Sequence, residues 1–150
     1  MQRASLVTIG VLVAACGLTL RAADTPPEDF VKAMKAVAAF AQEMGKPQAE
    51  MDFAKAKQYV PTVRDAFAVV ERYWLDRNQA GKYFKDIELA EEMIKLASDM
   101  GVAANLQNAE GVRWAVQTLG ERCQVCHDLR REKGPEGFLI KNCFSVSARP

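Results

Sequence analysis

Two cysteines and the chain's single histidine form the most chemically informative cluster in the sequence, Cys123-Gln124-Val125-Cys126-His127. This Cys-x-x-Cys-His spacing is the attachment signature of c-type haem. On a helix, at about 100° per residue, the three side chains fall on one face within little more than one turn. Two thiols can then bond to the two vinyl groups of one porphyrin while the imidazole binds the iron. The motif therefore predicts one covalently bound haem c.

Three other uses of these cysteines remain open. A zinc site would have three sulfur ligands and one nitrogen ligand, from Cys123, Cys126, Cys143 and His127. Cys126 and His127 are adjacent on a helix, however, and are awkward ligands for one tetrahedral ion. A thioredoxin-like redox pair needs a strand-to-helix turn in a βαβ unit, and the sequence has no such pattern. A disulfide is compatible with an exported protein. Cys143 is expected either to be free or to pair between the chains of a homodimer.

The first 23 residues resemble an export signal. Met1-Gln2-Arg3 supplies a charged start and 4–20 an apolar run, as in a secretory signal peptide, and an uncleaved anchor is the alternative. For cleavage after Ala23, Arg21 would be the third residue before the cut, where a small residue is wanted. Arg21 therefore disfavours this cleavage site. Val13-Ala14-Ala15-Cys16 resembles a bacterial lipobox, in which the cysteine is acylated. We therefore expect a periplasmic protein, either soluble or tethered to the membrane through a lipid on Cys16.

Composition and charge indicate an ordinary globular domain. The 150 residues are 49% hydrophobic and 26% charged, with a net charge of +1, which gives no electrostatic reason to expect nucleic acid as a partner. Removing residues 1–23 takes away Arg3 and Arg21, so that 20 − 2 = 18 basic and 19 acidic residues remain, a net charge of −1. We expect one domain over 24–141 and a C-terminal tail over 142–150.

Apolar residues recur at helical spacing in four segments, and no stretch alternates long enough to compete as a strand. The expected helices cover about 26–44, 49–76, 83–100 and 108–133. A capping box of Thr25 and Glu28 should start the first helix and Gly45 should end it. Pro61 should kink or briefly break the second helix, and Gly101 should end the third. Residues 138–140 could lie extended after the last helix.

Four helices with short connections predict an all-α fold, an antiparallel four-helix bundle with up-down-up-down order. Val116 and Leu119 place the cysteines on the core side of the fourth helix, so the covalent haem would lie on that helix, inside the bundle. Phe67, Tyr73 and Trp74 of the second helix are expected in the core, packed either against the porphyrin or against other side chains.

An exported, all-helical chain with this motif near its C-terminal end resembles the cytochrome c′ family. The resemblance spans about residues 26–141. Residues 123–131 are similar to the family's C-x-x-C-H-x-x-[Tyr or His]-Arg ending, and Pro27-Glu28-Asp29 is similar to its usual helix opening. The resemblance implies thioether bonds to Cys123 and Cys126, and His127 as the proximal iron ligand. It also implies that Arg131 neighbours the proximal face or a haem propionate.

Arg130 departs from the family, which tends to have an aromatic residue or histidine there. Residues three and four positions after His127 share its helical face, so both Arg130 and Arg131 could pair with propionates. Alternatively, Arg130 belongs to a solvated basic helix end, where its charge complements the helix dipole.

The sixth coordination position of the iron separates two functions. No second histidine exists, so within one chain a methionine or an open position remains. Met34 is the candidate ligand, because it lies about two turns into the first helix on its apolar face, where similar low-spin family members place a methionine. Alignment of the Pro-Glu-Asp opening instead puts Ala38 at the distal position, which leaves the iron open. A methionine on such a stripe is also commonly plain core.

The leading hypothesis from the sequence is an exported monohaem cytochrome that passes single electrons to an unidentified redox partner, with no enzymatic activity. The second is a five-coordinate cytochrome c′ that binds nitric oxide or carbon monoxide. The third is a non-haem interaction module built around zinc or a disulfide.

Overall fold

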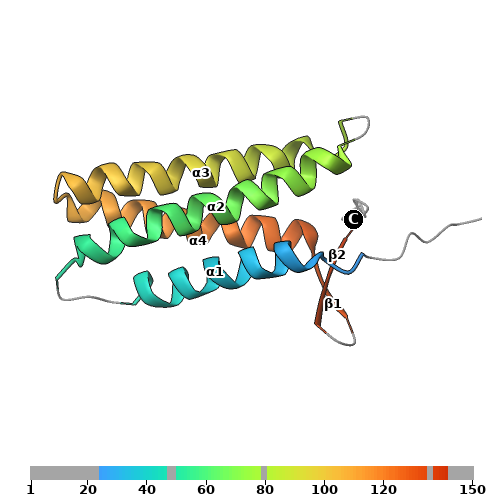
Figure 1. Ribbon diagram of the computed structural model, residues 1–150, viewed down its shortest axis with the longest axis horizontal. Helices are drawn as coiled ribbons and strands as arrows, with labels where there is room; N and C mark the ends of the chain where they lie inside the picture. The colour runs from blue at the N-terminus through green and yellow to red at the C-terminus, as the bar shows by residue number, and fades with distance from the viewer. Residues whose placement is uncertain (1–23, 47–49, 79–80, 135–136, 142–150) are drawn as a thin grey trace, which may run out of the picture.

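The computed structural model describes residues 24–46, 50–78, 81–134 and 137–141. Most of them lie in four helices that pack against one another (Figure 1): α1 (Glu28–Met44), α2 (Phe53–Arg77), α3 (Phe84–Asn105) and α4 (Ala109–Arg130). Successive helices run in opposite directions, so the prediction of four packed helices is confirmed. Among the described residues, no helix has the length and apolar character needed to cross a membrane.

The four helices do not contact one another equally. α2 packs closely against α1 and α3, and α4 packs closely against α3, whereas contacts between α1 and α4 are sparse. The core includes the fully buried side chains of Trp74, Met100 and Leu119. The expectation that Phe67, Tyr73 and Trp74 belong to the core is confirmed. The seam between α1 and α4 is therefore the least tightly packed side of the bundle.

α1 begins later than expected, and Thr25 does not cap it. The N-cap is Pro27, in an extended conformation and without a side-chain cap. The two prolines explain the difference, because a residue that precedes a proline is disfavoured in the helical conformation. Thr25 and Pro26 are therefore held outside the helix. Gly45 ends α1 as expected, and its N–H donates to the carbonyl oxygen of Ala41 at 3.0 Å.

The buried face of α1 also differs in part from the expected one. The apolar spacing of Met34, Val37, Ala38, Ala41 and Met44 predicts one inward face for this helix. Val37 and Met44 are buried, together with Phe40, whereas Ala38 and Ala41 are exposed. The cause is the sparse contact with α4, because no neighbouring helix covers the alanine side of α1.

α2 starts at Phe53 rather than near residue 49. The carboxylate of Asp52 caps it by accepting a hydrogen bond from the Lys55 N–H at 2.9 Å. The helix continues through Pro61 without the break that we expected. Proline removes one backbone donor, but Pro61 and Lys57, whose carbonyl loses its partner, are both exposed. Water can satisfy that carbonyl, so the proline leaves the buried side of α2 intact.

α3 does not end at Gly101 but continues to Asn105. A Cβ atom at Gly101 would lie 3.1 Å from Cγ2 of Val60, so this glycine allows the close approach of α2 and α3. The chain instead turns after the helix at Gln107, whose φ of 52° is in the left-handed region. Glycine is the usual residue in that conformation, so the residue type at Gln107 does not mark the helix end.

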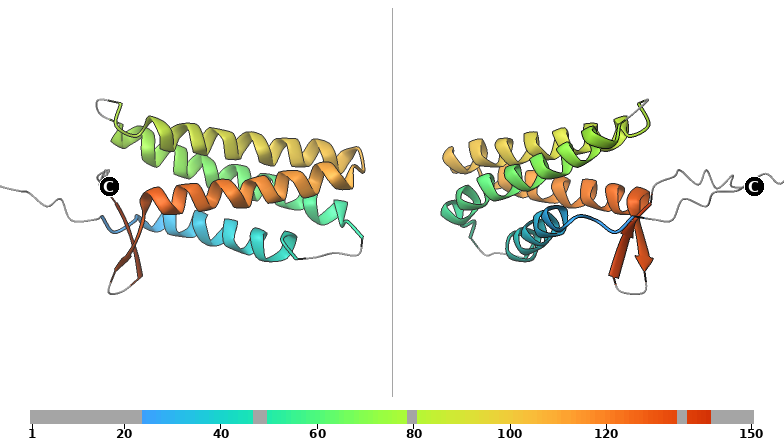
Figure 2. Two further views of the ribbon diagram at one scale, coloured as in Figure 1. Left: turned by 180° about the vertical axis from the view of Figure 1, so that it is seen from behind. Right: turned by 45° about the vertical axis from the view of Figure 1, so that its right-hand side comes forward.

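α4 ends at Arg130, earlier than expected, and the expectation that the chain has no strands is wrong. β1 (Arg131–Gly134) pairs antiparallel with β2 (Gly137–Ile140), so residues 138–140 are extended as expected. Figure 2 shows this hairpin at the end of the bundle where α1 begins and α4 ends. Asp24 and Ile140 exchange two backbone hydrogen bonds of 3.1 and 2.9 Å. Strands of this length are too short to produce a clear alternating pattern.

Candidate functional site

The Cys-x-x-Cys-His motif lies near the C-terminal end of α4, as the sequence predicts. Cys123, Cys126 and His127 are all partly buried, and both cysteines are free thiols, so no disulfide joins them. The helix that carries them begins at an Asn108 cap, whose side chain accepts a hydrogen bond from the Gly111 N–H at 3.0 Å. The motif is thus presented on a continuous helix.

An apolar cavity of about 750 Å³ lies beside Cys123. Cys123 lines it, together with side chains from α1, α2 and α4 that are mostly aliphatic or aromatic, among them Val37, Phe40, Met44, Phe67, Val116 and Leu119. Small-molecule and cofactor sites have volumes in this range and are lined mainly by apolar side chains. The cavity can therefore accept the apolar body of a bound group next to the Cys123 thiol.

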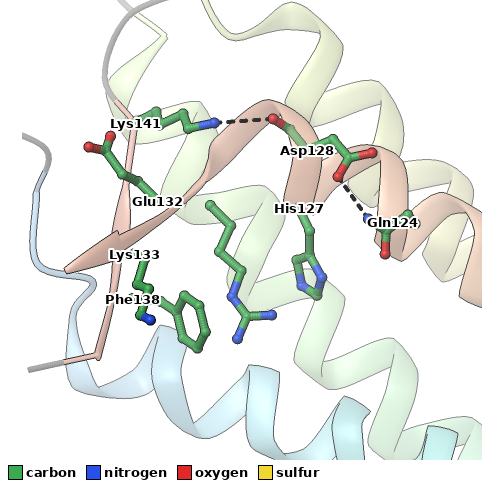
Figure 3. A pocket seen from close by; sticks show the side chains of 8 residues that line it. Gln124, His127, Asp128, Glu132, Lys133, Phe138 and Lys141 are labelled. Atoms are coloured by element: carbon green, nitrogen blue, oxygen red, sulfur yellow. Dashed lines mark hydrogen bonds between the residues drawn. The ribbon is translucent and has the colours of Figure 1, made fainter.

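Matching sides of α1 and α4 face this cavity. On α1, Ala41 lines the cavity, and Met34, seven residues earlier, lies on the same side of the helix at about 100° per residue. On α4, Gly120 and Cys123 line the cavity, and His127 lies on the same side as Gly120 by the same spacing. Figure 3 shows the His127 side chain extending from α4 toward α1.

The two distal candidates therefore lie on the α4-facing side of α1. Met34 is partly buried and packs against the core. Ala38 is exposed and, one turn after Met34, lies at the outer edge of the same stripe. Neither residue lines the apolar cavity. That Met34 or Ala38 faces a group bound at His127 stays a prediction.

His127 borders a second, more polar pocket of about 370 Å³ beside the hairpin. Figure 3 shows the Gln124 amide donating to the Asp128 carboxylate at 2.7 Å and the Lys141 ammonium donating to the Asp128 carbonyl at 3.3 Å. Burial lowers the pKa of His127, and the positive charge of Arg131 lowers it further, whereas Asp128 opposes both. Burial and Arg131 thus favour the neutral imidazole, which is the form that binds a metal.

Both thiols of the motif are held in the protonated state. Burial raises the pKa of Cys123 to about 11. Burial also raises the pKa of Cys126 to about 12, with smaller contributions from Asp86 and Cys123 against an opposing one from Arg130. A thioredoxin-like pair needs a thiol whose pKa is lowered. This environment therefore does not favour that alternative.

Arg130 is buried, so its assignment to a solvated helix end is wrong. Its side chain forms a bidentate ion pair with Asp86, in which Nε lies 2.6 Å from Oδ1 and Nη2 lies 2.5 Å from Oδ2. The guanidinium carbon lies 5.2 Å from the Trp74 ring centre and 4.9 Å from that of Tyr83. Pairing of Arg130 with a propionate stays a prediction, and these two nitrogens already bind Asp86.

Asp86 is the residue near the motif that sequence reasoning missed. It is three residues after Tyr83 and four before Ala90, so it lies on the apolar side of α3 and is almost fully buried. An acidic residue on an apolar helical face was the available signal. Its partner is 44 positions away, and helical periodicity contains no information on contacts at that separation.

Arg131 lies next to His127, on β1, and its side chain is exposed. Its guanidinium carbon lies 3.2 Å from the centre of the Phe138 ring, and it lines the same polar pocket as His127. Its position is compatible with the role that the resemblance implies. A contact with a propionate remains a prediction.

Several expectations fall on residues outside the described part of the chain: the signal segment 1–23, the lipobox Val13–Cys16, the tail 142–150 and the pairing or zinc ligation of Cys143. Among the described residues, no three histidine, cysteine, aspartate or glutamate side chains are placed to hold a metal ion. The zinc site therefore remains a prediction that depends on Cys143.

Cys123 thus lines the cavity, helical spacing puts His127 and Met34 on the sides of α4 and α1 that face it, and Cys126 lies near Asp86 of α3. Cys126 lines neither of the two pockets described. Comparison with known proteins found no matching family model, no matching curated protein and no matching solved structure.

Proposed function

We propose that this chain is an exported monohaem c-type cytochrome of the cytochrome c′ type, which carries single electrons through a haem bound to α4. The observation that carries the proposal is that Cys123, in a helical Cys-x-x-Cys-His motif, lines an apolar cavity of about 750 Å³ between α1, α2 and α4. A porphyrin attached to this motif needs apolar surface directly beside its thiols. The sparse contact between α1 and α4 supports a flat group in that seam.

Each residue of the motif has a separate task in this proposal. The thiols of Cys123 and Cys126 add across the two vinyl groups, which forms two S–C bonds and transfers each thiol proton to vinyl carbon. His127 is kept neutral by burial and by Arg131, and so presents a nitrogen lone pair to iron. The bound haem supplies a one-electron iron couple. The proposal includes no catalytic reaction.

The second candidate function is the binding of nitric oxide or carbon monoxide at five-coordinate iron. It is favoured by Ala38, a small exposed residue one turn from Met34 on the α4-facing side of α1. An alanine on the distal side of the haem leaves the iron without a sixth donor from α1. The neighbouring apolar cavity suits a small uncharged ligand.

The proposal places the protein in the periplasm. It rests on the charged start and apolar run of residues 1–23, and the lipobox-like segment ending at Cys16 makes a lipid anchor part of it. The redox partner is expected to be a protein or a small molecule that exchanges one electron, and nucleic acid is not an expected partner, given a net charge of +1. A zinc interaction module is the third candidate.

Haem staining after denaturing gel electrophoresis tests the main proposal. The protein is co-expressed with a c-type maturation system, and the wild-type band should stain. Cys123→Ala/Cys126→Ala should abolish the stain, and His127→Ala should abolish the native iron spectrum, because no other imidazole exists. Val125→Ala, at an exposed position inside the motif, should preserve both signals. An unstained wild-type band contradicts the proposal, and stoichiometric zinc in that protein would support the third candidate.

The optical spectrum of the stained protein separates the first two candidates. A low-spin spectrum indicates a sixth protein ligand and supports electron transfer through His/Met iron. A high-spin spectrum that changes on addition of carbon monoxide supports the open site and the gas-binding function.

A further inference from the structure

We propose that Asp86 and Arg130 are a positioning pair for the haem site. Their buried ion pair fixes the last turn of α4, and their opposite charges offset each other's effect on the reduction potential of the iron. This inference rests on the proposed haem function. It adds to that function two residues, one of which lies on α3 and far from the motif in sequence.

The pair has the geometry of a fixed unit rather than a mobile surface contact. Two parallel hydrogen bonds, Nε to Oδ1 at 2.6 Å and Nη2 to Oδ2 at 2.5 Å, join the guanidinium of Arg130 to the carboxylate of Asp86. The side chains are 5% and 0% exposed, respectively. A bidentate pair restricts the orientation of both groups, and burial removes the competition of water.

Aromatic side chains form the surroundings of the pair. The rings of Trp74 and Tyr83 lie near the Arg130 guanidinium, and their own centres are 5.2 Å apart. Tyr73 packs edge-to-face against Trp74, with their ring centres 4.8 Å apart. Such surroundings screen charges weakly, so each charge of the pair acts over a longer distance than a surface charge would.

Arg130 connects the pair to the motif and to the hairpin. It is four residues after Cys126 and three after His127, so all three lie on neighbouring positions of one helical face. The carbonyl oxygen of Arg130 accepts a hydrogen bond from the Lys141 N–H at 2.8 Å, and the Arg130 side chain donates to the Lys141 carbonyl at 3.4 Å. The last turn of α4 is thereby joined to α3 on one side and to the end of β2 on the other.

The charges of the pair also reach the motif. Arg130 lies one helical turn after Cys126 on the same face of α4 and binds Asp86 directly, so both charges lie beside the residue that would form the second thioether. In the intact pair their fields largely cancel. Removing either charge alone would leave the other uncompensated beside the bound group.

The sign of each effect follows from electrostatics. Asp86→Asn removes the negative charge beside the Arg130 cation, which favours Fe(II) over Fe(III) and should shift the reduction potential upward. Arg130→Gln leaves the Asp86 carboxylate, which favours Fe(III) and should shift the potential downward at pH 8. The double variant Asp86→Asn/Arg130→Gln removes both charges, so its potential should return close to that of the wild type.

A matched control exists on the same two helices. Arg122 of α4, next to Cys123, pairs with Glu92 of α3 at 2.8 Å, and their side chains are 42% and 39% exposed. Glu92→Gln makes the same carboxylate-to-amide change in a solvated pair, whose charges are screened by water and salt. It should leave the potential unchanged. Asp86→Asn should also lower the thermal midpoint by on the order of 10 °C, whereas Glu92→Gln should lower it little.

The experiment is a redox titration of the haem-loaded proteins at pH 8, with haem staining as the loading check. Shifts of opposite sign in the two single variants, with recovery in the double variant, are the expected result. Arg130→Lys keeps the charge and should keep the potential near that of the wild type. If haem-loaded variants all show the wild-type potential, or if both single variants shift in the same direction, the inference is overturned while the haem proposal stands.

Poor folding of the single variants does not remove the test. In that case the double variant should load more haem per protein than either single variant, because it leaves no unpaired buried charge. A double variant that loads no more haem than the worse single variant overturns the inference. A wild-type protein without covalent haem overturns the proposed function and this inference with it, and is recognised by the staining result alone.

Discussion

The guanidinium of Arg131 lies against the Phe138 ring across the hairpin, with its central carbon 3.2 Å from the ring centre. The register pairs Lys133 with Phe138 and Arg131 with Ile140, so Arg131 and Phe138 are diagonal neighbours on one face. Both also line the pocket that His127 borders, and Figure 3 shows the Phe138 ring beside this pocket. The contact therefore holds a positive charge near the imidazole, where it contributes to the lowered pKa of His127.

Phe138→Ala should loosen the hairpin beside His127. An exposed cation–π contact contributes about 0.5–1 kcal/mol, so we expect the amides of β1 and β2 to exchange with solvent several-fold faster, with little change in the amides of α2 and α3. Phe138→Tyr keeps the ring and should preserve the protection. Hydrogen exchange followed by mass spectrometry measures both, and equal exchange in the wild type and Phe138→Ala would show that the contact is not stabilising.

Filling the apolar cavity should prevent haem from entering it. Gly120 lines the cavity, and a Cβ atom built there meets no atom within 4 Å. We expect Gly120→Trp to reduce the haem content per protein severalfold, while circular dichroism shows that the helices are retained. Gly120→Ala is the matched control. It should keep the haem and raise the stability by up to about 1 kcal/mol through helix propensity. Full haem loading of Gly120→Trp would place the haem elsewhere.

The thiols of the protein made without haem should be slow to alkylate. Unfolded cysteines have a pKa of 9.0, whereas those of Cys123 and Cys126 in the folded chain are about 11 and 12. At pH 8 the thiolate fraction, which is the reactive form, is then lower by about 100-fold or more in the folded state. Iodoacetamide labelling read by mass spectrometry, with and without denaturant, measures the ratio. Similar rates in both conditions would contradict the burial of these thiols.

The same pKa difference predicts how stability depends on pH. Because the folded-state pKa values of both thiols are raised, the unfolded chain loses its thiol protons first as the pH rises above about 9. The free energy of unfolding of the haem-free protein should therefore fall between about pH 9 and pH 12. Cys123→Ser/Cys126→Ser should flatten this part of the profile in urea titrations. An unchanged slope in that variant would assign the fall to other groups.

Acylation of Cys16 should determine whether the protein is bound to the membrane. If Cys16 is acylated, two or three acyl chains anchor the protein firmly, and the wild type should sediment with membranes, whereas Cys16→Ser should be released or misprocessed. A chain that begins at Cys16 keeps Arg21 and has 20 − 1 = 19 basic and 19 acidic residues, a net charge of 0, which offers little electrostatic attraction to anionic lipid. A soluble wild type whose N-terminus lies near Asp24 would contradict the anchor.

The presence of each helix could be predicted from the sequence, because apolar residues recur periodically along it. The residues at which the helices begin and end could not, because they depend on contacts that this periodicity does not describe. Gly101 suggested a helix end and instead allows α3 to approach Val60 of α2, where a Cβ atom at this position would lie 3.1 Å from Cγ2 of Val60. Gln107, which has no helix-ending preference of its own, adopts the left-handed conformation. The Thr25 cap failed because two prolines follow it.

The candidate site likewise has a part that the sequence predicts and a part that it does not. The spacing of Cys123, Cys126 and His127 is local, so their common helix could be predicted. The apolar cavity beside Cys123 and the ion pair of Arg130 with Asp86 both depend on how distant segments meet. The sparse α1–α4 packing that leaves Ala38 exposed is likewise a property of the assembled bundle.

Met34 should lie on the distal side of the haem, either as an iron ligand or as part of the wall of an open pocket. It shares the α4-facing side of α1 with Ala41, which lines the cavity, and it packs against the core. The chain has a single histidine, so sulfur is the plausible sixth donor. Thioether ligation stabilises Fe(II), so Met34→Leu, which keeps the volume but removes the sulfur, should turn a low-spin haem high-spin and lower its reduction potential.

Carbon monoxide binding distinguishes two roles of Met34, as an iron ligand or as part of the pocket wall. If Met34 binds iron, both Met34→Leu and Met34→Ala should gain carbon monoxide binding, measured by the shift of the haem absorbance, because both lose the sulfur. If the wild type is already high-spin, Met34 is not a ligand, and only the change in side-chain volume in Met34→Ala should alter the gas affinity. Met100→Leu, at a fully buried methionine of α3 that lines neither pocket, serves as the control and should change neither spectrum nor affinity. If Met34→Ala also changes neither, Met34 is ordinary core, and Ala38→Leu should then weaken gas binding, because a larger side chain at the outer edge of the same stripe would cover the iron.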